Sequence, residues 1–250
     1  MRLKNKVAIV AGGARDIGKE VSLKLAKEGA KVIVNYFSSE ANAKDLVQKI
    51  IDSGGEAVAL KADVTKSNEI GALLDAGKKV FGNAVHVLVN VTGGLVARKT
   101  LADMDEHFWD EVINLNLRSV FLLCKHVVPL MPAGSSIINF SSQAGRDGGG
   151  FGAIAYATSK GGVSTFTRGL AKELGPVGIR VNAVCPGMIA TTFHDTFTKP
   201  EVRTAVANAT PLRRQGQAKE IADLVAYLAG NESAFITGTN IDINGGTYFS

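Results

Sequence analysis

A tyrosine and a lysine stand at the two ends of the segment Tyr156-Ala-Thr-Ser-Lys160. On a helix, residues at positions i and i+4 lie on one face, so the two side chains can share a site. A phenol can donate a proton to a carbonyl oxygen, and a neighbouring ammonium favours the phenolate that remains. The pair therefore suggests proton transfer at a carbonyl group. A surface Tyr–Lys pair at this spacing is also common, so the surrounding residues decide.

A serine directly after an apolar segment offers a third polar group. Ser142 follows the run 137–140 and precedes Tyr156 in the chain. Ligands of open α/β sheets bind at the carboxyl ends of strands, and a hydroxyl there can fix a carbonyl oxygen. Ser141 is the competing candidate at this position.

A glycine-rich turn, Ala11-Gly12-Gly13-Ala14-Arg15-Asp16-Ile17-Gly18, follows the first apolar run. Glycines at a strand–helix junction allow a tight turn and let phosphates approach backbone amides at a helix N-terminus. The alternative is an ordinary turn without a ligand. The turn does not have the GxGxxG spacing.

Short β-branched runs alternate with longer amphipathic segments along the chain. Strands are predicted at 6–11, 32–35, 57–61, 85–90, 136–140, 180–184 and 240–243, and helices at 17–29, 40–53, 67–81, 108–129, 155–174 and 218–229. This alternation implies parallel pairing through right-handed crossovers. We predict a single α/β domain over residues 1–250, a Rossmann-type doubly wound parallel sheet of about seven strands with helices on both faces. Residues 188–217 have no predicted element and form the predicted substrate flap.

The glycine turn resembles the TGxxxGxG turn of the short-chain dehydrogenase/reductase family, and the resemblance extends over essentially the whole chain. Two residues depart from the pattern: Ala11 replaces the usual Thr, and Asp16 stands where the middle Gly is expected. Aspartate tolerates left-handed backbone and can bond locally, so the turn can survive, but its carboxylate lies near an anionic ligand. The resemblance implies an NAD(P)-dependent oxidoreductase that acts on C=O and CH–OH groups.

The resemblance also implies a catalytic tetrad made of Asn116, Ser142, Tyr156 and Lys160. In that reading Ser142 orients the substrate carbonyl, and Asn116 carries a relay water to the lysine. Asn114 is the alternative to Asn116.

Cofactor contacts are implied mainly at the predicted strand ends. Asp63 and Val64, after the third strand, would meet the adenine. The segment 90–93, which corresponds to the family's NNAG segment, would make backbone contacts to the cofactor, and the segment 186–191 would meet the nicotinamide and the phosphates. The implied cofactor residues are Gly12, Arg15, Asp16, Ile17, Gly18, Tyr36, Ser38, Asp63, Val64, Asn90, Gly93, Tyr156, Lys160, Pro186, Gly187, Ile189 and Thr191.

The choice of nicotinamide nucleotide depends on the end of the second strand. An acid there would bind the ribose 2′-hydroxyl and repel a 2′-phosphate. Residues 34–39 contain no acid, while Arg15 and Ser38 can bind a phosphate. NADPH is therefore the expected preference, with NADH possible, although Asp16 adds negative charge nearby.

Substrate contacts are predicted from three segments, which are the one after Asn90, the one after Ser142, and the flap. The candidate substrate-binding residues are Gly94, Gln143, Arg146, Phe193, His194 and Lys199. Arg146 and Lys199 could pair with a carboxylate, which suits a small polar keto acid, or they could simply be solvated. The flap segment 185–203 resembles bacterial reductases of uronate-derived keto sugars, such as 4-deoxy-L-erythro-5-hexoseulose uronate. The turn and second strand equally resemble 3-oxoacyl-(acyl-carrier-protein) reductases, and a generic sugar or polyol dehydrogenase is a third reading. A non-catalytic nucleotide-binding sensor or scaffold is the alternative of another class.

Composition excludes several other classes. The chain has 250 residues and a formal net charge of +5, but its basic residues are dispersed, which argues against nucleic acid. No apolar run approaches the roughly 20 residues that span a bilayer, so we expect no membrane partner. The two cysteines form no disulfide framework or metal cluster, so no metal and a cytoplasmic location are expected. The tail 244–246 resembles the segment that packs in tetramers of the family, so we expect a homotetramer.

Overall fold

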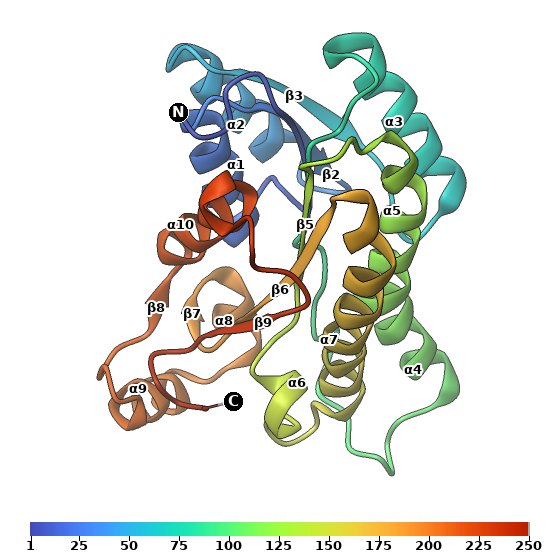
Figure 1. Cartoon of the computed structure of the whole chain (residues 1–250). Helices are drawn as coiled ribbons and strands as arrows, with labels where there is room; N and C mark the ends of the chain where they lie inside the picture. The colour runs from blue at the N-terminus through green and yellow to red at the C-terminus, as the bar shows by residue number, and fades with distance from the viewer. Residues whose placement is uncertain (250) are drawn as a thin grey trace.

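Seven short runs rich in β-branched residues pair in parallel to form one sheet, in the order β3-β2-β1-β4-β5-β6-β9 (Figure 1). The computed structural model describes residues 1–249. The strands are β1 (Val7–Ala11), β2 (Lys31–Tyr36), β3 (Glu56–Lys61), β4 (Val87–Asn90), β5 (Ser136–Phe140), β6 (Arg180–Pro186) and β9 (Asn240–Ile243). Parallel strands buried on both faces need continuous apolar sequence, and β1, β4 and β5 are buried throughout.

Helices cover both faces of this sheet, which confirms the predicted doubly wound α/β architecture. One apolar cluster joins a face of the sheet to α1 (Asp16–Lys27), α2 (Glu40–Asp52) and α10 (Ala218–Ala229). A second cluster joins the opposite face to α3 (Ser67–Phe81), α5 (Ser119–Val127) and α7 (Ile154–Leu174), and Figure 1 shows the two sets on either side of the strands. Each helix buries the apolar stripe that its sequence periodicity predicts.

The strand order reverses between β1 and β4. The chain moves outward from β1 to β2 and β3, then returns to place β4 on the other side of β1. Loops that follow two such neighbouring strands diverge to opposite faces and leave a crevice at their carboxyl ends. The fold thus fixes the location of a ligand site before any side chain is considered.

The predicted helix 108–129 is interrupted. It consists of α4 (Glu106–Ile113), a π-helical turn (Asn114–Arg118), α5 and a 3-10 turn (Val128–Leu130). The Asp105 side chain accepts a hydrogen bond from the Phe108 amide and caps α4. Single π-helical turns inside α-helices are frequent at functional sites, and this one contains Asn116.

The flap (residues 188–217) contains regular structure that the sequence analysis did not predict. It is built from β7 (Ile189–Ala190), α8 (Thr192–Phe197), α9 (Pro200–Ala209) and β8 (Gly216–Gln217), and β7 pairs with β8. Proline at the first position of α9 is favourable because it has no amide hydrogen to leave unpaired. The helices are short and weakly amphipathic, so periodicity gave little signal for them.

The described residues contain neither a membrane-spanning helix nor a cluster of metal-binding side chains. No helix within 1–249 combines the length and apolar character needed to cross a membrane. The same residues hold no group of three or more His, Cys, Asp or Glu side chains arranged to bind a metal.

Candidate active site

A cavity of about 550 Å³ lies at the carboxyl ends of the central strands. Its wall includes residues that follow or end six strands, at 12, 14–18, 35–39, 62–65, 91–93, 140–144 and 186–189. The remainder comes from the flap, the segment 147–156 and five further residues, namely Leu95, Arg98, Leu115, Lys160 and Thr247. The volume falls within the range of small-molecule and cofactor sites.

The glycine turn forms one end of this cavity. Gly12 has a φ of +73°, in the left-handed region that glycine adopts without steric cost, and a Cβ there would approach the Thr92 backbone nitrogen to 3.0 Å. At Gly18 a Cβ would lie 2.0 Å from the Gly12 carbonyl oxygen. The turn is therefore open to close approach at the N-terminus of α1, which is the environment a pyrophosphate needs.

Asp16 adopts the left-handed backbone that its sequence position required, with a φ of +49°. Its carboxylate does not bond within the turn as expected. It accepts hydrogen bonds from the Thr192 amide (2.9 Å) and the Thr192 hydroxyl (2.6 Å) at the start of α8. The negative charge of Asp16 therefore faces the flap, and these two hydrogen bonds connect the glycine turn to the flap.

The nucleoside end of the cavity is lined by Tyr36, Phe37, Ser38 and Ser39, with Arg15 and Val64 nearby. Asp63 also lines it, and its carboxylate accepts bonds from the Thr65 amide (3.0 Å) and hydroxyl (2.7 Å). Burial opposes ionisation of Asp63, but these bonds and the Lys66 ammonium hold its pKa below the usual value. The end of β2 carries no carboxylate that would repel a 2′-phosphate.

Asn90 differs from its predicted role because it does not line the cavity. Its side-chain nitrogen donates to Asn139 Oδ1 at 2.8 Å, and Asn139 in turn donates to the Thr167 hydroxyl. These buried bonds join β4, β5 and α7. The cavity wall begins one residue later and includes Val91, Thr92 and Gly93.

Tyr156 and Lys160 face the middle of the cavity from one side of α7. The Lys160 Nζ lies 5.8 Å from the centroid of the Tyr156 ring and donates a hydrogen bond to the Phe140 carbonyl at 2.8 Å. That carbonyl ends β5, so the lysine is anchored to the sheet. Across from it, Gly93 leaves room that a Cβ would fill, at 2.9 Å from Nζ.

The protonation of this pair follows from burial. Burial raises the pKa of Tyr156, and its contact with the Ser142 hydroxyl opposes the rise, so the phenol is protonated at neutral pH. Burial lowers the pKa of Lys160 to about 8, and the Cys185 thiol acts against that shift. A proton donor and a neighbouring cation therefore coexist near pH 7.

The two candidate serines have different environments. Ser141 is buried, donates to the Lys160 carbonyl (2.8 Å) and accepts from the Ser164 hydroxyl (2.8 Å). Ser142 is less buried, lines the cavity and accepts a hydrogen bond from the Ala144 amide at 3.1 Å. Its hydroxyl lies beside Tyr156 in the cavity, so Ser142 is the better placed of the two.

Asn116 lies behind the cavity wall and is fully buried. Its Oδ1 accepts from the Gly94 amide (2.9 Å), and its Nδ2 donates to the carbonyls of Gly94 (2.8 Å) and Val112 (2.9 Å). A Cβ on Gly93 would come within 2.6 Å of Oδ1. Asn116 thus fixes the backbone opposite Lys160, whereas Asn114 makes no side-chain hydrogen bond within residues 1–249.

The substrate end differs most from prediction. Gln143, Phe193 and His194 line it as expected, and the Phe193 ring lies 6.0 Å from the Tyr156 ring. His194 bonds the Thr198 hydroxyl at 2.9 Å through Nδ1, and burial lowers its pKa to about 4, so the imidazole is neutral. Gly94 and Lys199 do not line the cavity, and Lys199 is exposed at the N-terminus of α9.

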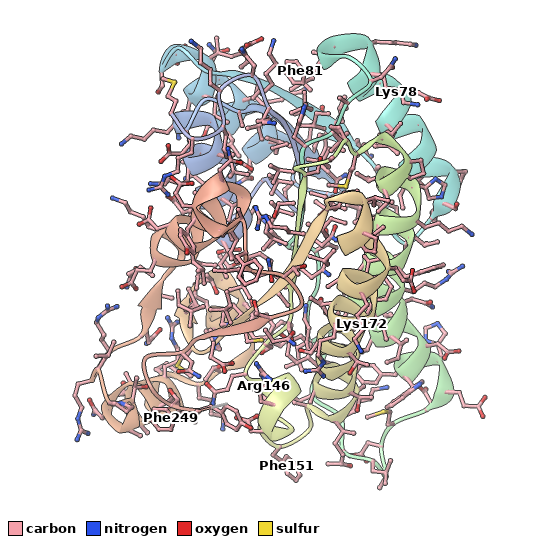
Figure 2. All side chains as sticks on the ribbon, in the orientation of Figure 1. Lys78, Phe81, Arg146, Phe151, Lys172 and Phe249 are labelled. Atoms are coloured by element: carbon pink, nitrogen blue, oxygen red, sulfur yellow. The ribbon has the colours of Figure 1, made fainter. Side chains whose placement is uncertain are left out.

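Arg146 is also not a cavity residue. Its Nη2 donates to the Asn240 carbonyl at 2.7 Å, and its Nε lies 3.4 Å from the Asp242 carboxylate. Both partners belong to β9, whereas Arg146 itself lies on α6 (Ala144–Asp147), where Figure 2 labels it. The predicted substrate residue Arg146 is therefore not brought to the cavity, because its guanidinium attaches α6 to the edge of the sheet.

Arg98 lines the cavity and was missed by the sequence analysis. Its Nη1 donates to the Phe151 carbonyl at 2.8 Å and its Nε to the Phe197 carbonyl at 3.2 Å. The segment 91–103 has no helix or strand, so no periodicity indicated where its side chains point. The only available signal was the position of this basic residue shortly after the end of β4.

The comparisons with known proteins cover the whole chain. A family model described as enoyl-(acyl carrier protein) reductase matches residues 12–248. The 3-oxoacyl-(acyl-carrier-protein) reductase FabG of Staphylococcus epidermidis is 37% identical over 98% of this chain and 99% of its own. The 3-oxoacyl-(acyl-carrier-protein) reductase of Synechocystis is 39% identical, over 98% and 97% of the two chains.

Solved structures give the same result. A short-chain dehydrogenase/reductase from Serratia marcescens superposes with a TM-score of 0.92 at 32% identity, over 98% of this chain and 99% of that one. A blue fluorescent protein from a metagenomic library, solved in complex with NADPH, gives a TM-score of 0.93 at 32% identity over 100% of both chains. These likenesses extend over the sheet, the helices and the flap alike.

Proposed function

The chain belongs to the short-chain dehydrogenase/reductase family, and from that premise we propose that it reduces a small polar keto acid with NADPH. Members of this family are NAD(P)-dependent oxidoreductases that act on carbonyl and hydroxyl groups. The observation that carries the proposal is the meeting of Tyr156, Lys160 and Ser142 in one cavity with the glycine turn. A keto uronate such as 4-deoxy-L-erythro-5-hexoseulose uronate is the first candidate substrate.

The cavity fits a nicotinamide nucleotide along its length. The glycine turn would hold the pyrophosphate, Tyr36 to Ser39 and Val64 would surround the adenosine, and Pro186 to Thr191 would border the nicotinamide. NADPH is favoured because β2 ends without an acid and Arg15 lies at the same end. When bound, the reduced nicotinamide supplies the hydride.

The chain's own residues handle the substrate oxygen and its proton. The Ser142 hydroxyl donates a hydrogen bond to the carbonyl oxygen and orients it, and the Tyr156 hydroxyl transfers its proton to that oxygen as the hydride reaches carbon. The Lys160 ammonium stabilises the resulting phenolate, and proton return from solvent completes the cycle. Asn116 holds the backbone opposite Lys160 and so positions it.

The polar character of the substrate end supports a sugar-derived acid. Gln143 and neutral His194 offer hydrogen bonds to hydroxyl groups, while Phe193 packs toward the tyrosine. The second candidate, a 3-oxoacyl-(acyl-carrier-protein) reductase, is supported by the names of the relatives from Staphylococcus and Synechocystis. The two functions differ in the compound that enters the flap end of the cavity.

The assembly and location belong to the same proposal. Trp109 and Phe121, on α4 and α5, and Phe249 near the C-terminus are large apolar side chains that remain exposed in the single chain. Exposed apolar groups of this kind favour burial between subunits. We therefore propose that the protein forms a homotetramer in the cytoplasm. Within each subunit, the flap would cover the substrate.

The proposal is tested by NADPH and NADH oxidation with the keto uronate and an acetoacetyl thioester side by side. We expect faster turnover of the uronate, and a loss of about a thousandfold or more in kcat for Tyr156→Phe with NADPH binding retained. A preference for the thioester would assign the protein to fatty-acid synthesis. Full reductase activity of Tyr156→Phe would contradict the assignment of the proton donor, whereas a wild type that binds NADPH but reduces neither compound would favour a sensor or scaffold.

A further inference from the structure

The substrate end of the cavity contains a guanidinium that the proposed reaction does not use. We propose that Arg98 binds the substrate carboxylate and thereby makes the enzyme selective for keto acids, an inference that rests on the proposed function. Arg98 enters this end from the segment between β4 and α4. It replaces Arg146 and Lys199 in the role that the sequence analysis gave to them.

The geometry of Arg98 leaves donors for a ligand. Its Nε and one Nη1 hydrogen are directed to the carbonyls of Phe197 (3.2 Å) and Phe151 (2.8 Å). A guanidinium has five N–H groups, so one further hydrogen on Nη1 and two on Nη2 remain. Within residues 1–249, Nη2 has no hydrogen-bond acceptor. Two adjacent donors on Nη1 and Nη2 match the two oxygens of a carboxylate.

The two carbonyls also preorganise the side chain. Phe197 ends α8 in the flap, and Phe151 lies in the loop between α6 and α7, at the edge of the molecule in Figure 2. The guanidinium therefore has a fixed orientation wherever those two segments are in place. A ligand then binds it with little loss of side-chain entropy.

The backbone before Arg98 is strained. Val96 has a φ of +63°, which is costly for a β-branched residue, and its neighbour Leu95 is buried. The Lys99 amide donates to the Gly152 carbonyl at 3.1 Å and fixes the segment on the other side. Strain of this kind persists where the surrounding structure imposes it and is concentrated in ligand-binding sites.

The other charged groups at this end leave the anion to Arg98. Asp147 lines the cavity, but its carboxylate accepts from Gln143 Nε2 (2.9 Å) and from the Gly149 amide (2.8 Å). His194 is neutral, and Lys160 is buried with its ammonium on the Phe140 carbonyl. Among the described residues that line the substrate end, Arg98 is thus the cation open to a ligand.

The experiment compares an acid with its neutral ester. We expect Arg98→Gln to lower kcat/KM for the keto uronate about 100-fold and to change that for its methyl ester less than threefold. Arg98→Lys should recover part of the loss, because it keeps the charge but not the two-pronged donor. Lys99→Gln, which removes the neighbouring cation outside the cavity, should leave both substrates within threefold of wild type.

Equal losses on acid and ester would overturn the inference, because Arg98 would then only hold the flap through Phe197. A wild-type enzyme that reduces neither compound would instead overturn the proposed function. In that case, calorimetric titration of NADP⁺-loaded protein with glucuronate and its methyl ester decides the inference. Binding of the acid that is lost in Arg98→Gln supports it, and equal or absent binding of the two compounds by wild type overturns it.

Discussion

The two ends of the cavity are built in different ways. The nucleotide end consists mainly of backbone at the ends of parallel strands, with the glycine turn at its centre. The substrate end consists of side chains from three separate segments, the one after β4, the one that runs from the end of β5 to α7, and the flap. A sheet places its strand ends by topology alone, whereas side chains from loops depend on how those loops pack. The chemistry is therefore fixed by the fold, and the substrate choice by the packing of loops.

Among the variants that test this contrast between the two ends, the largest effect should come from the backbone wall at Gly93. A Cβ there would lie 2.6 Å from Asn116 Oδ1 and 2.9 Å from Lys160 Nζ, so Gly93→Ala must displace one of these buried groups. We expect kcat to fall about 100-fold, because shifts of about 1 Å in a catalytic arrangement can cost that much. Steady-state kinetics measure the loss, and thermal unfolding checks that the variant folds.

Gly94→Ala is the matched control for this prediction. A Cβ on Gly94 would meet only Leu115 Cδ2, at an ordinary contact distance of 3.8 Å. Its kcat should stay within threefold of wild type. Equal losses of activity in both glycine variants would show that this segment tolerates no substitution. They would contradict the claim that Gly93 is required for the space beside Lys160.

A smaller effect is expected at the end of β2, where a single side chain tests the nucleoside site. Ser38→Asp places a carboxylate where it can bind a ribose 2′-hydroxyl and repel a 2′-phosphate. We expect kcat/KM for NADPH to fall about 30-fold relative to that for NADH. The neutral Ser38→Asn should change the ratio less than threefold, and the same shift in both variants would contradict an electrostatic cause.

The same contrast explains which features the sequence predicted. Helix α10 and strand β9 were predicted with their observed bounds, because apolar periodicity records which face is buried. Ser142 and the Tyr156–Lys160 pair were predicted because they lie at a strand end and on one helix face. These positions follow from regular backbone geometry.

Two arginines that the sequence did not place as observed have hydrogen-bond partners far away in the chain. Arg146 looked like an anion ligand, but its partners Asn240 and Asp242 come from β9. Arg98 was missed because its orientation depends on carbonyls at Phe151 and Phe197. Periodicity carries no information about such long-range contacts between loops.

The smallest effect concerns Asp16, which connects the two ends of the cavity through Thr192. Asp16→Asn keeps a side chain that tolerates the left-handed backbone and keeps an oxygen for the Thr192 amide, but removes the charge. Because that charge lies in the phosphate turn, KM for NADPH should fall about threefold at low salt and less at high salt. Thr192→Val, which removes the hydroxyl bond alone, should leave this KM within twofold while increasing hydrogen exchange in α8. A rise in KM for Asp16→Asn would contradict this prediction and would mean that the carboxylate mainly holds the flap closed over the cofactor. The hydrogen bonds from Asp16 to Thr192 would then outweigh the repulsion between the carboxylate and the cofactor phosphates.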